Sequence, residues 1–568
     1  MWWVYVLLCL VSGFAYARFD PYFMDGDSVS FLDIADGLRS HHASLAINSY
    51  WNPAYPALLA AVQAIVHPSR WHELEAYAYL NALIFAACLF AVVYVVNGLV
   101  HLQSLLNPGR LDDAAVSPLA LRYVGAALLV LSFQRELPMG FVRSDPLLLL
   151  LFLLAAGLLL RIQIGGRLWR YAALGLVLGL AYLTKSFAFL PSGFLFLGML
   201  IFGLTRKGEA RRRIAFGAVL AGVVFLAVAG PYIAAISHQM GHVTTGESAR
   251  LNYAFFVDET PRWHEGPHGD LGHAGGVFLH PEITLLKSPW VFSFRNHPVG
   301  TFPLWFDPAY FTAGLKPHVW LTGHIRRLVR CTQLLVLWLI GHPEGPLLLA
   351  VLLASGAVFR RPRKQLAMWL VVPAWGLLMI GIYFPIDLQE RYLTAVLLLG
   401  LLPVLALLRR PGSAAVVRVG NGLAVLLALI AISGSFREIL DLRRHLHIAG
   451  RSAGLYSPQI FGAAEGLVAM GLKPGDAVGC MGGHACYLDP YWARLAQVQI
   501  LGEVEIPDTT PADVAWNQIA DKAAVEAALR SQGLRVLVTW MPTAGRIPQG
   551  WQQLGSSAYF AYPLTESR

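Results

Sequence analysis

Long apolar runs recur along this 568-residue chain, each of about 15 to 24 residues and close to the length at which a helix crosses a bilayer. Inside a bilayer, only helices and closed barrels satisfy all of their own backbone polar groups. Hydrophobic residues make up 56% of the chain and charged residues only 14%, a composition that excludes an ordinary soluble enzyme. The sequence therefore predicts a polytopic α-helical membrane protein.

We expect about eleven transmembrane helices from these runs. They cover residues 2–16, 76–99, 118–134, 146–161, 170–185, 188–204, 214–236, 345–359, 366–384, 392–408 and 418–435. Arg and Lys cluster in three connectors, at 161–170, 206–213 and 360–364. By the positive-inside rule, these connectors face the cytoplasm.

The segment 325–341 is also partly apolar, but its apolar and basic residues fall on different helical faces. This pattern predicts an interfacial helix that lies along the membrane surface and does not span it. Four segments then lie outside the cytoplasm: the first loop at 18–75, a short turn around 135–145, the long loop at 237–324, and the tail from about 440 to 568. The formal net charge of +9 comes mainly from the cytoplasmic connectors, so it indicates contacts with membrane lipids and not with nucleic acid.

The tail differs in composition from the rest of the chain. Residues 476–481 and 534–540 are typical of strands, and residues 523–530 of a helix. We therefore expect two domains, a transmembrane domain at 1–438 and a small extracytoplasmic α/β domain at 439–568.

Cys480 and Cys486 lie in this tail and are separated by five residues, which include Gly482 and Gly483. In an oxidising compartment such a pair forms a local disulfide, and the alternative is two free thiols. A zinc site is not indicated, because no second ligand pair accompanies these cysteines.

An acidic motif, Asp25-Gly26-Asp27, directly follows the first apolar run. The residues after it predict an amphipathic helix over 28–38, and Asp27 stands where the N-cap of that helix belongs. One interpretation is that Asp27 is only a cap, but capping leaves Asp25 unexplained and does not exclude catalysis. The two carboxylates also suit Mg²⁺ or Mn²⁺, although nothing in the sequence requires a metal.

Residues 27–35, together with the Pro-rich stretch at 51–59, resemble the first outer loop of the GT-C glycosyltransferases. Residues 144–147, 179–185 and 389–393 are similar to the branch containing the protein O-mannosyltransferases and the lipid A aminoarabinose transferases. The likeness covers roughly residues 1–410. The chain departs from that branch at Ser28, where its members often carry Glu, and in having Asp25.

The resemblance implies a GT-C fold with interfacial helices in the first outer loop. It also implies an inverting transfer of a sugar from a polyprenyl phosphate donor to an extracytoplasmic acceptor, which is a lipid, a polysaccharide or a protein. The enzyme would lie in the bacterial inner membrane with its active site on the periplasmic side, and it would need no cofactor unless a divalent cation takes part.

This chemistry needs a base and fixed positive charge. A carboxylate takes the proton of the attacking hydroxyl, for which Asp27 is the first candidate and Asp25 the second. Lys185 and Arg391 lie at the outer ends of two expected spans, where they would stabilise the leaving phosphate. Arg143 is a third candidate for the same role. The plain alternative for these cations is that they extend to the lipid headgroups.

Asp145 precedes Pro146 at the start of an expected span. It is either a second carboxylate, which orients the acceptor or pairs with Lys185, or a helix cap. A membrane transporter or flippase of a lipid-linked or anionic substrate is the alternative function. Transporters carry charged residues near the middle of their spans, whereas the charged residues here lie mainly at span ends.

Overall fold

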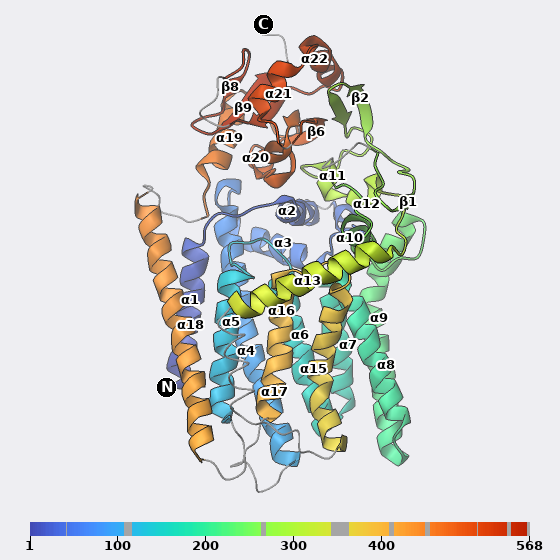
Figure 1. The fold of residues 1–568 in the computed structure, drawn as a ribbon, viewed down its shortest axis with the longest axis vertical. Coiled ribbons are helices and arrows are strands. Elements are labelled where there is room, and N and C mark those ends of the chain that lie inside the picture. Colours follow the sequence, from blue (N-terminus) through green and yellow to red (C-terminus); the bar gives the residue numbers. More distant parts are fainter. Residues whose placement is uncertain are drawn as a thin grey trace.

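The computed structural model describes residues 1–40, 42–106, 116–262, 269–341, 363–407, 414–448, 455–507, 509–541 and 547–564. Long helices form a bundle, and a domain that contains a β-sheet covers one end of it (Figure 1). The bundle helices are α1 (Trp2–Phe19), α4 (Glu73–Leu106), α5 (Pro118–Arg135), α6 (Asp145–Ile164), α7 (Leu168–Thr184), α8 (Phe189–Leu204), α9 (Gly208–Met240), α15 (Arg363–Tyr383), α16 (Glu390–Val396), α17 (Leu402–Leu407) and α18 (Ala414–Ile448).

Within the described residues, seven segments are long and apolar enough to cross a membrane. They are Trp2–Phe19, Arg70–Leu105, Asp145–Ile164, Ser186–Leu204, Gly208–Met240, Glu390–Leu407 and Val417–Arg444. The helices α7 and α15 are apolar but shorter, and α5 lies in the bundle without meeting these criteria. The predicted polytopic helical architecture is thus confirmed, while the expected span at 345–359 lies outside the described residues.

Small residues let the bundle helices approach closely. A Cβ atom added at Gly175 of α7 would lie 2.2 Å from the carbonyl oxygen of Ala221 in α9. Such contacts are typical of membrane bundles, where lipid is as apolar as the side chains and close packing drives helix association. Large apolar side chains such as Phe194, Leu197 and Val223 instead point outward, as expected of a lipid-facing surface.

Several helices lie across the bundle instead of along it. The first loop supplies α2 (Gly26–Arg39) and α3 (Ala54–Val66), which lie at the bundle end nearest the sheet (Figure 1). The long loop supplies α10 (Ser248–Phe256) at the same end. Further along the chain, α13 (Leu321–Gly341) runs obliquely across the bundle helices (Figure 1). The described part of the expected interfacial segment 325–341 is therefore one helix that does not follow the bundle axis.

The sheet has seven strands in the order β2-β3-β6-β5-β7-β9-β8. Its centre is parallel and consists of β5 (Ala477–Met481), β6 (Gln499–Val504) and β7 (Val536–Trp540). The outer strands are β2 (Ile283–Lys287), β3 (Trp290–Ser293), β8 (Gln552–Gln553) and β9 (Tyr559–Pro563). The strands expected at 476–481 and 534–540 are present as β5 and β7, and the helix expected at 523–530 is present as α22 (Lys522–Ser531).

The tail does not form this sheet alone. Strand β3 belongs to the long loop and pairs antiparallel with β6 of the tail, with Val291 opposite Val504. Two segments that are about 200 residues apart therefore share one sheet. The last bundle helix, α18, also continues to Ile448, past the expected domain boundary at 438. Within the tail, Cys480 and Cys486 are joined in a disulfide.

Candidate active site

The acidic motif begins helix α2, with a different cap from the one that the sequence predicted. Asp25 is the N-cap, because its backbone is extended and its Oδ1 accepts hydrogen bonds from the Ser28 backbone N–H at 2.9 Å and from the Ser28 hydroxyl at 2.8 Å. The prediction that Asp27 is the N-cap is therefore wrong. The chain offers three cap-forming residues within four positions, so the sequence alone does not choose between them. Asp27 lies in the first turn instead, free of the capping role.

Gly26 has a steric reason to stand between the two carboxylates. A Cβ atom at this position would lie 2.2 Å from the indole ring of Trp305, so only glycine lets the ring approach the start of α2. The Trp305 Nε1–H donates a hydrogen bond to Asp27 Oδ1 at 3.1 Å. The other carboxylate oxygen of Asp27 has no hydrogen-bond partner among the described residues.

A cavity of about 240 Å³ lies beside this carboxylate, between α2, the bundle helices and the long loop. Its walls include five of the six predicted catalytic and phosphate-binding residues, namely Asp27, Arg143, Asp145, Lys185 and Arg391. The sixth, Asp25, is not part of the wall and forms an ion pair with Arg143. The structure thus brings together residues that lie as far apart in the chain as Asp27 and Arg391.

Asp145 connects the two principal cations of the cavity. Its Oδ1 lies 2.7 Å from Lys185 Nζ, and its Oδ2 lies 3.8 Å from Arg391 Nε. Ser144, and not Asp145, holds the N-cap position of α6. Of the two interpretations of Asp145, the structure therefore supports a carboxylate that pairs with Lys185. The ion pair also keeps Lys185 from extending to the lipid headgroups.

Arg391 keeps hydrogen-bond donors available. Its side chain is only 14% exposed, yet its nearest hydrogen-bond acceptor among the described residues is the Tyr392 hydroxyl at 3.4 Å, and its Nε donates no hydrogen bond to a described residue. The Nε of Arg143 is likewise buried and without a described partner. Buried donors of this kind are uncommon, because an unmade hydrogen bond costs about 1–3 kcal/mol, and an anionic ligand would satisfy them.

Stacked aromatic rings form one side of the cavity. Phe187, Tyr383 and Tyr392 lie in a row with ring centroids 3.9 and 4.0 Å apart. The Lys185 ammonium lies 4.7 Å from the centre of the Tyr392 ring, and the Arg391 guanidinium lies 5.3 Å from it. This ring therefore helps to hold both cations through cation–π contacts.

Asn52 positions the turn that carries Lys185. Its side-chain Nδ2 donates to the Tyr182 carbonyl at 2.9 Å, and its Oδ1 accepts from the Ser186 N–H at 3.0 Å. These contacts bracket Lys185, which has an extended backbone at the end of α7. The Pro-rich stretch at 51–59 thus contributes a structural contact that fixes a cation of the cavity.

The electrostatic surroundings of Asp27 make its carboxylate a better proton acceptor. Burial is the largest effect, and with the nearby charge of Asp25 it raises the pKa of Asp27 above the usual value. Arg143, Arg391 and the Trp305 hydrogen bond act in the opposite direction without cancelling the rise. A raised pKa brings a carboxylate closer to the range in which a general base is most effective.

A divalent cation held by Asp25 and Asp27, which the sequence left open, would have to compete with the contacts of Asp25. Both oxygens of Asp25 are engaged, one by Ser28 and one by Arg143. An Mg²⁺ or Mn²⁺ ion shared by Asp25 and Asp27 would therefore displace Arg143. Nowhere in the described ranges do three or more His, Cys, Asp or Glu side chains lie close enough to hold a metal ion.

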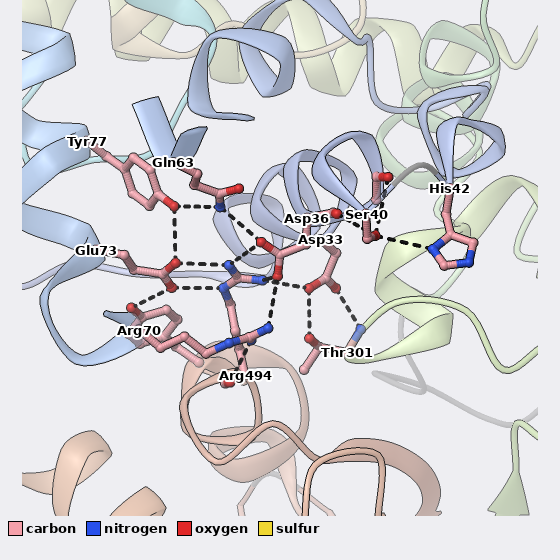
Figure 2. A network of polar contacts seen from close by, with 12 residues as sticks. Asp33, Asp36, Ser40, His42, Gln63, Arg70, Glu73, Tyr77, Thr301 and Arg494 are labelled. Atoms are coloured by element: carbon pink, nitrogen blue, oxygen red, sulfur yellow. Dashed lines mark hydrogen bonds and ion pairs between the residues drawn. The ribbon is translucent and has the colours of Figure 1, made fainter. Parts of the chain in front are cut away.

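The tail reaches α2 through a buried arginine of the short helix α20 (Tyr491–Leu495). Figure 2 shows Arg494 among three carboxylates from two helices, Asp33 and Asp36 of α2 and Glu73 of α4. Its side chain is 1% exposed, and it donates hydrogen bonds of 2.9 to 3.3 Å to all three. Burial opposes its charge, but Glu73 and Asp36 hold the pKa of Arg494 well above its usual value.

The long loop contacts the same helix. The Thr301 N–H donates to Asp33 Oδ2 at 2.6 Å, and the Thr301 hydroxyl donates to Asp33 Oδ1 at 2.9 Å (Figure 2). The middle of α2 is thus held by the tail and the long loop, while its first turn presents Asp27 to the cavity.

Sequence analysis did not find two residues that the long loop brings to the cavity, Trp305 and Arg262. Both lie in a segment without helical or strand periodicity, so no local pattern marks them. Tyr50 and Asn52 also line the cavity. Asn52 belongs to the Pro-rich stretch at 51–59 and Tyr50 precedes it, but the sequence assigned no role in the site to either residue.

None of the protein-family models and none of the curated protein sequences compared with this chain matches it. Solved structures do match. The Archaeoglobus fulgidus oligosaccharyltransferase, in a crystal structure with Zn and sulfate, superposes with a TM-score of 0.50 at 11% identity, over 94% of this chain and 67% of that one. ArnT from Cupriavidus metallidurans, bound to undecaprenyl phosphate, matches with a TM-score of 0.43 at 13% identity, over 99% of this chain and 98% of that one. The chain therefore has the fold of the archaeal oligosaccharyltransferase, which is the GT-C fold that the sequence resemblance implied.

Proposed function

We propose that this chain is an inverting glycosyltransferase that moves a sugar from a polyprenyl phosphate donor to an extracytoplasmic acceptor. The observation that supports this most is the composition of one cavity. It holds a carboxylate with an open oxygen, Asp27, together with three cations on other elements, Arg143, Lys185 and Arg391. Acid–base chemistry beside a phosphate leaving group needs this combination of charges.

Asp27 is the proposed general base. A hydroxyl that attacks the anomeric carbon loses its proton as the new bond forms, and the free oxygen of Asp27 is available to take it. Asp25 is less suited to this role, because capping and the ion pair with Arg143 occupy both of its oxygens. Trp305 holds Asp27 by its other oxygen and so fixes the direction of the carboxylate.

Arg391 and Lys185 are the proposed phosphate-binding groups. The bond from the anomeric carbon to the phosphate oxygen breaks as the acceptor bond forms, and the leaving phosphate keeps the electron pair. Fixed cations in a site that excludes water stabilise that charge without reorganisation. Arg391 has hydrogen-bond donors that the described residues leave unsatisfied. Asp145 forms ion pairs with both Arg391 and Lys185 and so helps to orient them.

The proposed location is a bacterial inner membrane, with the cavity and the sheet domain on the periplasmic side. The basic connectors support this orientation by the positive-inside rule. The cavity residues of the first loop lie at the bundle end that the sheet domain covers (Figure 1). The fold shared with an oligosaccharyltransferase supports the reaction class, and a tail above the cavity is well placed to contact an acceptor.

The test is sugar transfer by the purified full chain in detergent, with a panel of radiolabelled polyprenyl phosphate sugars. We expect one donor to be consumed by the wild type and not by Asp27→Asn, while Asp25→Asn keeps measurable turnover. Thermal melting of each variant checks that it folds. If no donor is consumed but vesicles containing the protein move labelled substrate across the membrane, the transferase proposal fails and a transporter takes its place.

A further inference from the structure

A second cavity, of about 190 Å³, lies in the sheet domain and shares no lining residue with the candidate active site. It opens at the edge where the parallel strands end. The turn after β5 contributes Gly482 and His484 to its lining, and the segment after β6 contributes Thr509 and Thr510. Trp540, the last residue of β7, also lines it.

The topology of the sheet marks this edge as a binding position. The chain passes from β5 to β6 on one side, and then returns to place β7 on the other side of β5. After β7 the chain continues to β8 and β9, which lie on the side of β7 away from β5. The connections that follow β5 and β7 therefore run in opposite directions from the carboxyl ends of these two strands. In open α/β sheets, ligands bind in the crevice at such a switch point, because diverging loops leave a gap there.

The turn that follows β5 is closed by a disulfide. The Cys480–Cys486 disulfide closes the segment that contains Gly482 and His484. Gly482 has a φ of 80°, and a Cβ atom at this position would lie 2.9 Å from the side chain of Ile506. Only a residue without a side chain fits this position easily, so the backbone of Gly482 itself lines the cavity.

The lining chemistry selects the class of ligand. His484 and Trp540 present adjacent rings, with centroids 4.5 Å apart and planes at 32°. Thr509 and Thr510 also line this space, and none of the described lining residues is Asp, Glu, Lys or Arg. The described lining therefore offers no Lys or Arg side chain to pair with a phosphate or carboxylate. A neutral ring with one apolar face and several hydroxyl groups finds both an aromatic surface and hydrogen-bond partners.

We propose that this cavity, formed by the turn after β5, the segment after β6 and Trp540, is a binding site for a neutral saccharide. The site is separate from the transfer cavity, so the proposal does not depend on the reaction assigned to Asp27. An envelope polysaccharide or glycosylated acceptor would be held through such a site while another part of it reaches the membrane surface.

Saturation-transfer NMR on the full chain in detergent tests this proposal, with glucose, galactose, mannose, N-acetylglucosamine, cellobiose and lactose as probes. We expect ring-proton signals from at least one of these sugars with the wild type. Trp540→Ala should weaken its binding roughly tenfold, equivalent to ~1.4 kcal/mol, because the aromatic face is lost. Trp540→Phe keeps a ring and should retain most of the binding.

Two control variants separate this site from its surroundings. Leu488→Ala removes an exposed side chain near the disulfide-closed turn and should leave binding unchanged. Asp27→Asn changes the transfer cavity and should bind the sugar like the wild type, whatever its activity. The absence of signal for every sugar, or equal signals from the wild type and a folded Trp540→Ala variant, would overturn the proposal.

Discussion

Arg494 Nε donates to Glu73 Oε1 at 2.9 Å and Arg494 Nη2 donates to Glu73 Oε2 at 3.0 Å, so paired hydrogen bonds join the sheet domain to the first residue of α4. The same guanidinium contacts Asp33 and Asp36 on α2 (Figure 2). Breaking a buried ion pair by removing one partner costs about 3–5 kcal/mol, because the other charges stay buried without compensation. We therefore expect Arg494→Met to lower the thermal midpoint strongly and to reduce transfer, measured by melting in detergent and by the donor assay.

Arg535→Met is the matched control for that substitution. Arg535 also belongs to the tail and pairs with a carboxylate, Asp476, at 2.6 Å, but its side chain is 41% exposed. Exposed pairs contribute less than about 1 kcal/mol, because water screens them. Equal losses of stability in the two variants would contradict a special role for Arg494 in joining the tail to α2.

The helical bundle could be predicted from physical patterns in the sequence, and most of the candidate site from those patterns together with the family resemblance. The thickness of the bilayer sets the length of each expected span, and the positive-inside rule predicts which end of the span lies outside. Residues at the outer ends of different spans then lie at one surface. Asp145, Lys185 and Arg391 each lie at an end of a bundle helix, and each belongs to a stretch that the family resemblance had singled out.

The parts that the sequence did not predict depend on contacts between distant segments. Trp305 reaches Asp27 from a loop without periodicity, and no local pattern connects the two. Strand β2 is mostly exposed and β3 has only four residues, so neither shows the alternation that would mark a strand of the tail's sheet. The choice between Asp25 and Asp27 as the cap depended on backbone geometry, since both residue types are good caps.

A pH profile distinguishes the roles of the two carboxylates in the motif. Asp27 must be ionised to act as a base, so transfer should fall as the pH drops below its pKa. Asp25 raises that pKa, and Asp25→Asn should therefore shift the acidic limb of kcat/KM to lower pH. Asparagine caps helices about as well as aspartate, so the start of α2 should be retained. An acidic limb that stays in place would argue against Asp27 as the titrating base.

Asp489 gives the tail its own pH dependence. Burial is the main reason that its pKa is raised to about 7, although Tyr22 donates hydrogen bonds to both of its oxygens, at 3.0 and 2.9 Å. The native state keeps a proton that the unfolded chain loses near its ordinary value of 3.8. The contribution of Asp489 to the free energy of unfolding is therefore fully present below pH 3.8 and is lost as the pH rises through about 7.

Asp489→Asn should accordingly flatten the fall of the melting temperature between pH 4 and pH 8, a window set by these two values. The variant should melt higher than the wild type at the alkaline end. Glu465→Gln, an exposed position on α19 (Pro458–Ala469) of the same domain, serves as the control and should follow the wild-type curve. Parallel curves for Asp489→Asn and the wild type would show that Asp489 titrates normally.

The cations of the cavity can be tested separately from the ion pair that holds one of them. Lys185→Met should lower transfer by roughly 10²–10³-fold, the loss typical when one preorganised group that stabilises a developing anion is removed. Part of that loss would arise because Asp145 loses its nearest cation and keeps only weaker interactions with Arg391 and Arg143. The double variant Lys185→Met with Asp145→Asn removes the charge of Asp145. If Lys185 acts on the leaving phosphate, the double variant stays impaired, whereas recovery of transfer would mean that Lys185 serves only to neutralise Asp145.

Lys287→Met is the control for the loss of a positive charge. Lys287 is exposed on β2 and does not line the cavity, so this variant should leave the transfer rate unchanged.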